Sequence, residues 1–189
     1  MTGSASPTKW RAYCAARRTL GQMPEPAFSR FRGRYRLAAS FQSASFSHLA
    51  ANTQAGYSSL LRLALSYAAL DSLCSAMQVQ LNAQVVDDRG LADRLRSRRG
   101  ERIAAVMRAD VDEPLRRRLN DLLDNSESTN VLAAAAFYRH KFLHGHLTAS
   151  RAGTGRSPWE RAVVDDLAGL LLVAADDLFT VHVAAPMPG

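Results

Sequence analysis

The sequence has few of the features that define several common classes of protein. It contains only two cysteines, Cys14 and Cys74, which are far apart and outside any Cys-x-x-Cys pattern. This usage indicates neither a disulfide framework nor a cysteine zinc site. The longest strongly apolar stretch, residues 167–175, has an aspartate pair on each side, so we expect no membrane-spanning helix. The first residues lack a signal-peptide pattern, and together these absences predict a cytoplasmic protein.

β-Branched residues are scarce beside alanine and leucine, and this balance favours helix over strand. With 189 residues, 47% of them apolar, the chain is long enough to form one domain with a sizeable core. We therefore predict an all-α fold, a bundle of about five to seven helices. In this prediction residues 1–26 form an N-terminal helix and a linker, and residues 27–185 form the core bundle.

The expected helices follow from apolar periodicity and from residues that favour helix ends. The clearest is 54–82, which we expect at the centre of the bundle. Ser157 and Pro158 are typical of a helix start, and the final helix is expected to run to about residue 183. The remaining segments expected to be helical are 7–20, 28–52, 87–100, 101–109, 112–123 and a segment that begins near 128–130 and ends at Gly145.

The charge is unbalanced and unevenly distributed. The chain carries a net charge of +7, and 22 of its 24 basic residues are arginine. Clustered guanidinium groups attract phosphate backbones, so an anionic partner such as RNA is expected, although many of these arginines would equally suit solvated helix faces. The candidates for RNA contact are Arg94, Arg98, Arg99, Arg116, Arg117 and Arg118. Residues 160–189 are net acidic, which predicts one basic and one acidic surface.

The most distinctive segment lies at the end of the helix predicted to stop at Gly145. Three of the five histidines, His140, His144 and His146, fall within seven residues there, beside Arg139. Histidine transfers protons near neutral pH, and arginine binds phosphate through two parallel hydrogen bonds. Because RNA supplies its own 2′-hydroxyl nucleophile, such a set is sufficient for strand scission without a metal.

Other interpretations of the same residues remain open. His140 and His144 have the i, i+4 spacing of a helical zinc site, but Lys141 stands where metalloproteases have a glutamate and would repel a cation. We therefore expect no metal and no cofactor. The histidines would also suit the C-terminal end of a helix dipole without any catalytic role. Asp71, on the same helix face as Tyr67, is a candidate to orient Arg139 or a histidine, and it would serve equally as a surface acid.

The segment Tyr138-Arg139-His140-Lys141-Phe142-Leu143-His144-Gly145-His146 resembles the signature of the HEPN superfamily, in which an arginine, usually followed by a polar residue, precedes a histidine with four to six intervening residues. Arg139 and His144 match with four intervening residues, and Arg139 and His146 match with six. The resemblance implies a helical homodimer whose two motifs meet to form a metal-independent endoribonuclease site.

In that interpretation His144 transfers the proton, with His146 as second candidate, and Arg139 binds the phosphate. A toxin or defence component with an antitoxin-like protein partner is one expected role for such an enzyme. Some members of the superfamily bind RNA, nucleotides or proteins without cutting. The alternative prediction is therefore a non-catalytic RNA-binding or protein-interaction module.

Overall fold

The computed structural model describes residues 6–109 and 111–185, which form eight α-helices and one short 3-10 helix, η1. Within these ranges no strand is found, only an isolated antiparallel bridge between Asp87 and Asn130. The all-α prediction is confirmed, and each of the eight segments expected to be helical corresponds to one α-helix, one more than the upper end of the predicted five to seven. In chain order the elements are α1 (Trp10–Thr19), α2 (Pro26–Ser40), α3 (Ala51–Ala76), η1 (Leu81–Ala83), α4 (Arg89–Arg96), α5 (Glu101–Arg108), α6 (Glu113–Asp124), α7 (Leu132–Leu143) and α8 (Pro158–Ala184).

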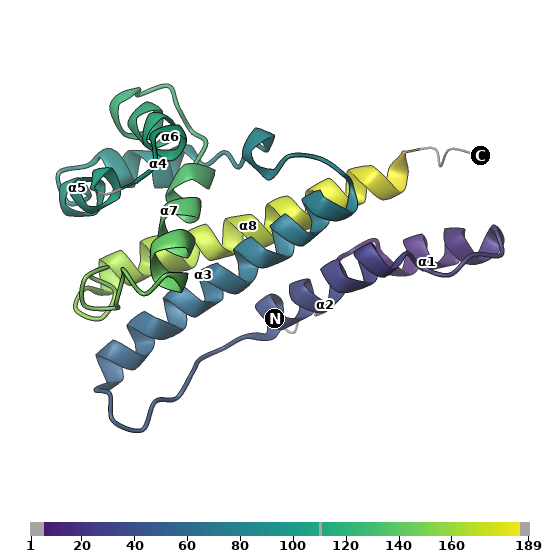
Figure 1. The fold of residues 1–189 in the computed structure, drawn as a ribbon, viewed down its shortest axis with the longest axis horizontal. Helices are drawn as coiled ribbons and strands as arrows, with labels where there is room; N and C mark the ends of the chain where they lie inside the picture. The colour runs from purple at the N-terminus through teal and green to yellow at the C-terminus, as the bar shows by residue number, and fades with distance from the viewer. Residues whose placement is uncertain (1–5, 110, 186–189) are drawn as a thin grey trace.

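Helices α3 and α8, with 26 and 27 residues, run side by side through the middle of the molecule (Figure 1). Leucine, valine and alanine recur along both at three- and four-residue steps, so each presents an apolar face to the other. The side chains buried in this part of the core include Leu60, Leu63, Leu70 and Leu73 from α3 and Val164, Leu167, Leu171 and Ala175 from α8. Helix α2 lies along α3 as well. The predicted central position of the 54–82 helix is thereby confirmed, although it runs from Ala51 to Ala76.

The N-terminal helix α1 packs against the same core through aromatic side chains. The ring of Trp10 lies 6.1 Å from that of Phe179 on α8, and the ring of Tyr13 lies 5.3 Å from that of Phe28 on α2. Just before α1, the backbone N–H of Thr8 donates a hydrogen bond of 2.7 Å to Asp176 of α8. The segment predicted as an N-terminal helix and linker is therefore joined to the bundle by packing and by a polar contact.

The short helices α4, α5 and α6 form a separate group at one end of the long pair (Figure 1). Two of them begin at aspartate caps. The side chain of Asp88 accepts a 2.7 Å hydrogen bond from the N–H of Leu91, and that of Asp112 accepts one of 2.9 Å from Leu115. These bonds satisfy N–H groups that the first turn of a helix leaves without a partner. The predicted helices at 87–100, 101–109 and 112–123 are thus found, with ends shifted by a few residues.

The prediction of one helix over residues 28–52 is wrong for the second half of that range. Helix α2 ends at Ser40, and Phe41 already has extended backbone angles, φ −68° and ψ 122°. Contacts from α3 hold the following segment in this form. The N–H of Ala44 donates to the Ser58 hydroxyl at 3.0 Å, and Arg62 donates to the carbonyl of Gln42 at 2.9 Å. These bonds replace the helical ones that residues 41–50 would otherwise make.

Helix α8 passes through both aspartate pairs that flank the apolar stretch at residues 167–175, as the predicted final helix does. An 18-residue window within it has a mean hydropathy of 1.7, so α8 is long and apolar enough to cross a membrane by length and composition. The aspartate pairs by themselves therefore do not exclude a membrane span. In the structure 28% of that window is buried, and α8 packs along α3; core helices of soluble proteins pass the same test.

Candidate functional site

Helix α7 carries the histidine cluster from the middle of the molecule to its surface. Residues 132–138 are all buried, including the four alanines whose small size allows α3, α6 and α8 to approach closely. The helix becomes exposed on one side from Arg139 onward. Gly145, at φ 73°, follows its end and donates its N–H to the carbonyl of Phe142 at 3.1 Å. Glycine adopts this left-handed conformation without strain, and the predicted helix end at Gly145 is confirmed.

His140 and His144 form an exposed pair in the last turn of α7. Their ring centres are 4.5 Å apart and their planes are tilted by 51°. Partial desolvation lowers the pKa of His140, and the charges of His144 and Lys141 act in the same direction, while Asp112 opposes them. Two imidazolium groups at this distance repel each other, and this repulsion is one of the causes that lower the pKa of His140. One neutral and one protonated imidazole are the groups that general base and general acid catalysis require.

Arg139 lies beside this pair and is turned toward α3. Its guanidinium carbon lies 5.5 Å from the ring centre of Tyr67, a cation–π geometry. Burial raises the pKa of the Tyr67 hydroxyl, and the charges of Arg139 and Asp71 influence it in opposite directions. The sequence interpretation placed Tyr67 and Asp71 near this site, and it is the tyrosine that contacts the arginine. No described residue forms an ion pair or a hydrogen bond with Arg139, so nothing in residues 6–109 and 111–185 joins it directly to His144 or His146.

His146 is separated from the other two histidines because it follows the turn at Gly145. It lines a cavity of about 320 Å³ between α5 and α7, which we call the α5–α7 cavity. The residues around this cavity are Arg102, Ala105, Val106, Ala109, Phe137, Lys141, His146, Leu147 and Arg151. The four predicted catalytic residues thus occupy three places: the histidine pair, the face of Tyr67, and the wall of this cavity.

Lys141 is buried, with 8% of its surface exposed, and its side chain lines the α5–α7 cavity. Its charge lowers the pKa of His140, in agreement with the argument that it disfavours a cation at the histidine pair. Across the part of the chain that is described, no cluster of three or more histidine, cysteine, aspartate or glutamate side chains is arranged to hold a metal ion. Metal-free chemistry stays a prediction, to be tested with a chelator.

Three of the arginines predicted to contact RNA already have acidic partners. Arg94 pairs with Asp166 of α8, while Arg116 and Arg117 both pair with Glu113 on their own helix, at 3.3 and 3.0 Å. Arg118 donates to the side chain of Asn82 at 3.0 Å. These contacts do not prevent phosphate binding, but each must be weakened or shared when a phosphate binds.

Arg98 and Arg99 are more accessible. Both are exposed at the junction of α4 and α5, and neither forms an ion pair with a described residue. The Trp159 ring contacts two guanidinium groups. The guanidinium carbon of Arg99 lies 5.2 Å from the ring centre, and that of Arg94 lies 5.8 Å from it. The basic surface predicted from the sequence is therefore most open at this junction, close to the start of α8.

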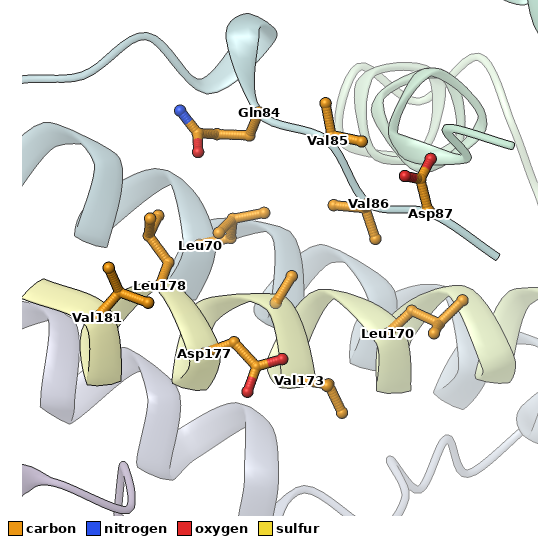
Figure 2. Close-up of a pocket in the computed structure, with 11 residues that line it drawn as sticks. Leu70, Gln84, Val85, Val86, Asp87, Leu170, Val173, Asp177, Leu178 and Val181 are labelled. Carbon is orange, nitrogen blue, oxygen red and sulfur yellow. The ribbon is translucent and has the colours of Figure 1, made fainter.

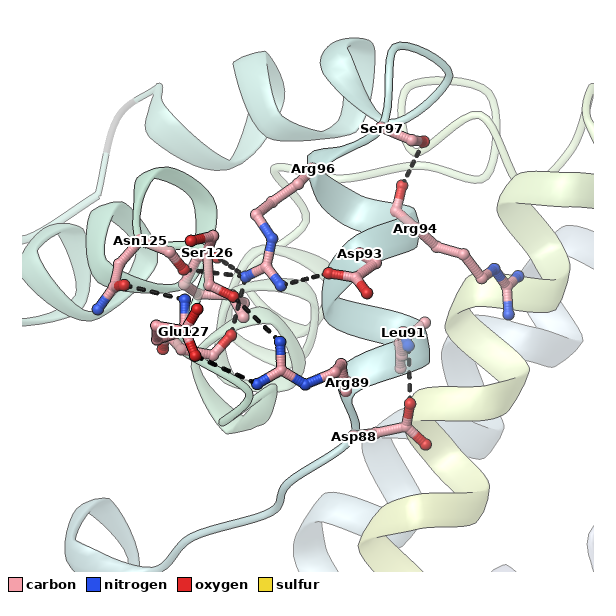
Figure 3. Close-up of polar contacts among 12 residues, drawn as sticks. Asp88, Arg89, Leu91, Asp93, Arg94, Arg96, Ser97, Asn125, Ser126 and Glu127 are labelled. Carbon is pink, nitrogen blue, oxygen red and sulfur yellow. Dashed lines mark hydrogen bonds and ion pairs between the residues drawn. The ribbon is translucent and has the colours of Figure 1, made fainter.

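Arg96, in contrast, has a structural role (Figure 3). It donates to three backbone carbonyls, those of Leu122 at 2.9 Å, Asn125 at 3.1 Å and Ser128 at 2.8 Å, and it also binds Asp93 at 2.6 Å. These carbonyls lie in the last turn of α6 and in the loop to α7. One side chain thereby satisfies acceptors that a helix end leaves without partners. Nothing in the sequence distinguishes it from its exposed neighbours.

A second hollow lies between the segment after η1 and helix α8 (Figure 2). It has a volume of about 330 Å³ and is lined mainly by apolar side chains. Three of these, Val85, Val173 and Val181, are 57–67% exposed. We call it the η1–α8 groove; it contains no histidine or arginine and has no catalytic character.

Comparison of the chain with protein-family models, with curated proteins and with solved structures finds no match in any of the three. The resemblance to the HEPN superfamily therefore rests on the motif at the end of α7.

Proposed function

We propose that the chain is a metal-independent endoribonuclease of the HEPN type, with His140 and His144 as its acid–base pair. One imidazole accepts the proton of the 2′-hydroxyl, whose oxygen attacks the adjacent phosphorus. The other imidazole donates a proton to the 5′-oxygen that leaves. The products are a 2′,3′-cyclic phosphate and a 5′-hydroxyl, so protons and bonds balance without a metal or an external water.

The observation that carries this proposal is the 4.5 Å separation of the two exposed imidazoles, together with the lowered pKa of His140. A lowered pKa keeps His140 neutral at pH 7 and therefore able to act as the base. The sequence interpretation ranked His144 first and His146 second, whereas the geometry favours His140 as the partner of His144. His146 faces the α5–α7 cavity and is assigned no proton transfer here.

Arg139 is proposed to bind the scissile phosphate. The cation–π contact with Tyr67 uses no N–H group of the guanidinium as a hydrogen-bond donor to a polar atom, so its N–H groups are available to bind a phosphate. Tyr67 then holds the arginine in one orientation. The homodimer, the antitoxin-like partner, the toxin or defence role and the cytoplasmic setting belong to this proposal through the HEPN resemblance alone.

The test is a cleavage assay on mixed RNA with and without EDTA. His140→Asn and His144→Asn should each lower kcat by about a hundredfold or more, because each removes one proton transfer. Arg139→Ala should lower kcat/KM by a similar order, because it removes a charged contact to the phosphate. His48→Asn, in the segment between α2 and α3, is the matched control and should cut as the wild type does. Full activity of the two histidine variants, or loss of wild-type activity in EDTA, would show that the mechanism is wrong.

The second candidate function is a non-catalytic interaction module, and the η1–α8 groove favours it. Exposed valines around a preformed apolar hollow are typical of a surface that contacts another protein. If this groove joins two copies of the chain, Val173→Arg should shift the species measured by light scattering from dimer to monomer, while Arg34→Gln on α2 should not. A wild-type chain that is monomeric at all concentrations would contradict self-association.

A further inference from the structure

The α5–α7 cavity has the composition of a binding site for an anion with a flat apolar part. Its floor and one wall are apolar, formed by Val106, Phe137 and Leu147, and two small exposed alanines, Ala105 and Ala109, leave its mouth open. Its volume, about 320 Å³, is within the range of small-molecule sites. No acidic residue is among the described residues that line it.

The cations of this cavity differ from most other arginines of the molecule. Arg102 and Arg151 are exposed at its rim, and neither forms an ion pair with a described residue. The side chain of Arg151 donates a hydrogen bond to the carbonyl of His146 at 3.2 Å, which orients its guanidinium group beside the cavity. A phosphate between these two arginines would gain charge-assisted hydrogen bonds without breaking an existing ion pair.

A buried carboxylate lies behind the two arginines. Glu160 is only 6% exposed, and its Oε2 accepts no hydrogen bond from a described residue. It shares a small adjoining cavity of about 10 Å³ with Arg102 and Arg151. Its charge is opposite in sign to those of the two guanidinium groups, so it attracts both of them to this rim.

The cavity also adjoins the histidine pair. Phe137 and Lys141 line it, and His140 and His144 occupy the neighbouring face of α7, because successive residues of a helix are 100° apart. A ribonucleotide chain that leaves the cavity past His146 would therefore pass the end of α7.

We propose that the α5–α7 cavity is a nucleotide-binding subsite, in which one base lies on the apolar floor and its phosphate binds Arg102 and Arg151. The inference rests on the proposed ribonuclease function, since it assigns the cavity to one unit of the RNA substrate. A nucleoside phosphate is the ligand class, and it is recognised either as part of RNA or as a free mononucleotide.

Calorimetric titrations of the full chain test the subsite. The probes are the four nucleoside 3′-monophosphates, adenosine, inorganic phosphate, and a 2′-O-methyl tetranucleotide that cannot be cut. At least one nucleoside monophosphate should bind about tenfold more tightly than adenosine or inorganic phosphate alone, because only it occupies both the floor and the rim. Tighter binding of the tetranucleotide identifies RNA as the source, and equal binding identifies a free nucleotide.

The variants locate the binding site. Arg102→Gln and Arg151→Gln should each weaken binding about tenfold or more, and Ala105→Phe, a change at an exposed position, should abolish it by filling the mouth. Arg34→Gln on α2 removes the same charge far from the cavity and is the matched control. Unchanged affinity in the three cavity variants, or inorganic phosphate binding as tightly as every nucleotide, would overturn the subsite.

Failure of the subsite can be told apart from failure of the ribonuclease proposal. The His140→Asn/His144→Asn variant should bind nucleotide as the wild type does, because neither residue lines the cavity. If the wild type binds nucleotide but cuts no RNA, the nucleotide subsite is supported and the ribonuclease proposal is wrong. If RNA is cut and the cavity variants have unchanged KM and affinity, the ribonuclease stands and the subsite falls.

Discussion

Between α3 and α8 the contacts are mainly apolar, whereas around α4 and α6 arginine side chains bind carboxylates and backbone carbonyls. The first region consists of two long helices with many fully buried leucines. The second consists of helices of 8 to 12 residues, which are too short to be stable alone and depend on their contacts. The candidate site lies where the two regions meet, since α7 packs against α3 and α6. Both regions bury apolar side chains in one core, and the region of the short helices adds a set of arginine contacts.

The largest effect that separates the two regions is expected from Leu63→Ala in α3. Leu63 has no exposed surface, so its truncation removes buried apolar contacts and leaves a cavity. We expect the free energy of unfolding to fall by about 2 to 5 kcal/mol, measured by urea denaturation. Val181→Ala on the exposed side of α8 is the control and should change it by less than about 0.5 kcal/mol. A small loss at Leu63 would mean that apolar packing does not dominate the α3–α8 pair.

Arg96→Gln should act on the second region alone. It removes the charged donor to three carbonyls and to Asp93, at a side chain with 13% exposure. We expect a loss of about 1 to 3 kcal/mol, with faster amide hydrogen exchange confined to the end of α6 and the loop to α7. Arg98→Gln, two residues further on and exposed, should leave exchange unchanged. Equal acceleration of exchange in α3 would show that the two regions unfold as one unit.

The smallest effect concerns protonation of His140. Its folded-state pKa is lowered, so the unfolded chain binds this proton more readily, and stability should decrease as the pH falls from 6.5 through the folded-state pKa. Because His140 is exposed, the change is expected to be slight. NMR titration of the imidazole should give a pKa below 6.5, and His144→Asn should raise it only in part, since desolvation is the larger cause. A pKa at or above 6.5 in the wild type would contradict this account.

The helix starts in the second region could be predicted because they depend on local chemistry. Asp88 and Asp112 cap α4 and α6 through bonds to N–H groups three residues later, a pattern visible in the sequence. The end of α2 at Ser40 could not be predicted in this way. It depends on Ser58 and Arg62 of α3, which bind the backbone of residues 42–44 only in the folded chain. The aspartates of α8 lie within the predicted final helix, and Asp165 forms an ion pair with Arg62 of α3 at 2.9 Å.

The candidate site was predictable to a similar extent. The i, i+4 spacing places His140 and His144 on one face, and the structure brings their rings together. The direction in which the Arg139 side chain points depends on the position of Tyr67 on α3. The separation of His146 from the other two histidines depends on the turn at Gly145. The α5–α7 cavity combines residues from α5, α7 and the loop before α8, so no local pattern in the sequence indicates it.

The position of Trp159 gives the molecule a built-in optical reporter. The chain has two tryptophans; Trp10 is buried in the aromatic cluster around Phe179, whereas Trp159 is half-buried between Arg94 and Arg99 and immediately precedes Glu160. Indole emission responds to nearby charge and to water. The emission of a Trp10→Phe chain would therefore come from Trp159 alone and would follow events at the basic end of the molecule without an attached dye.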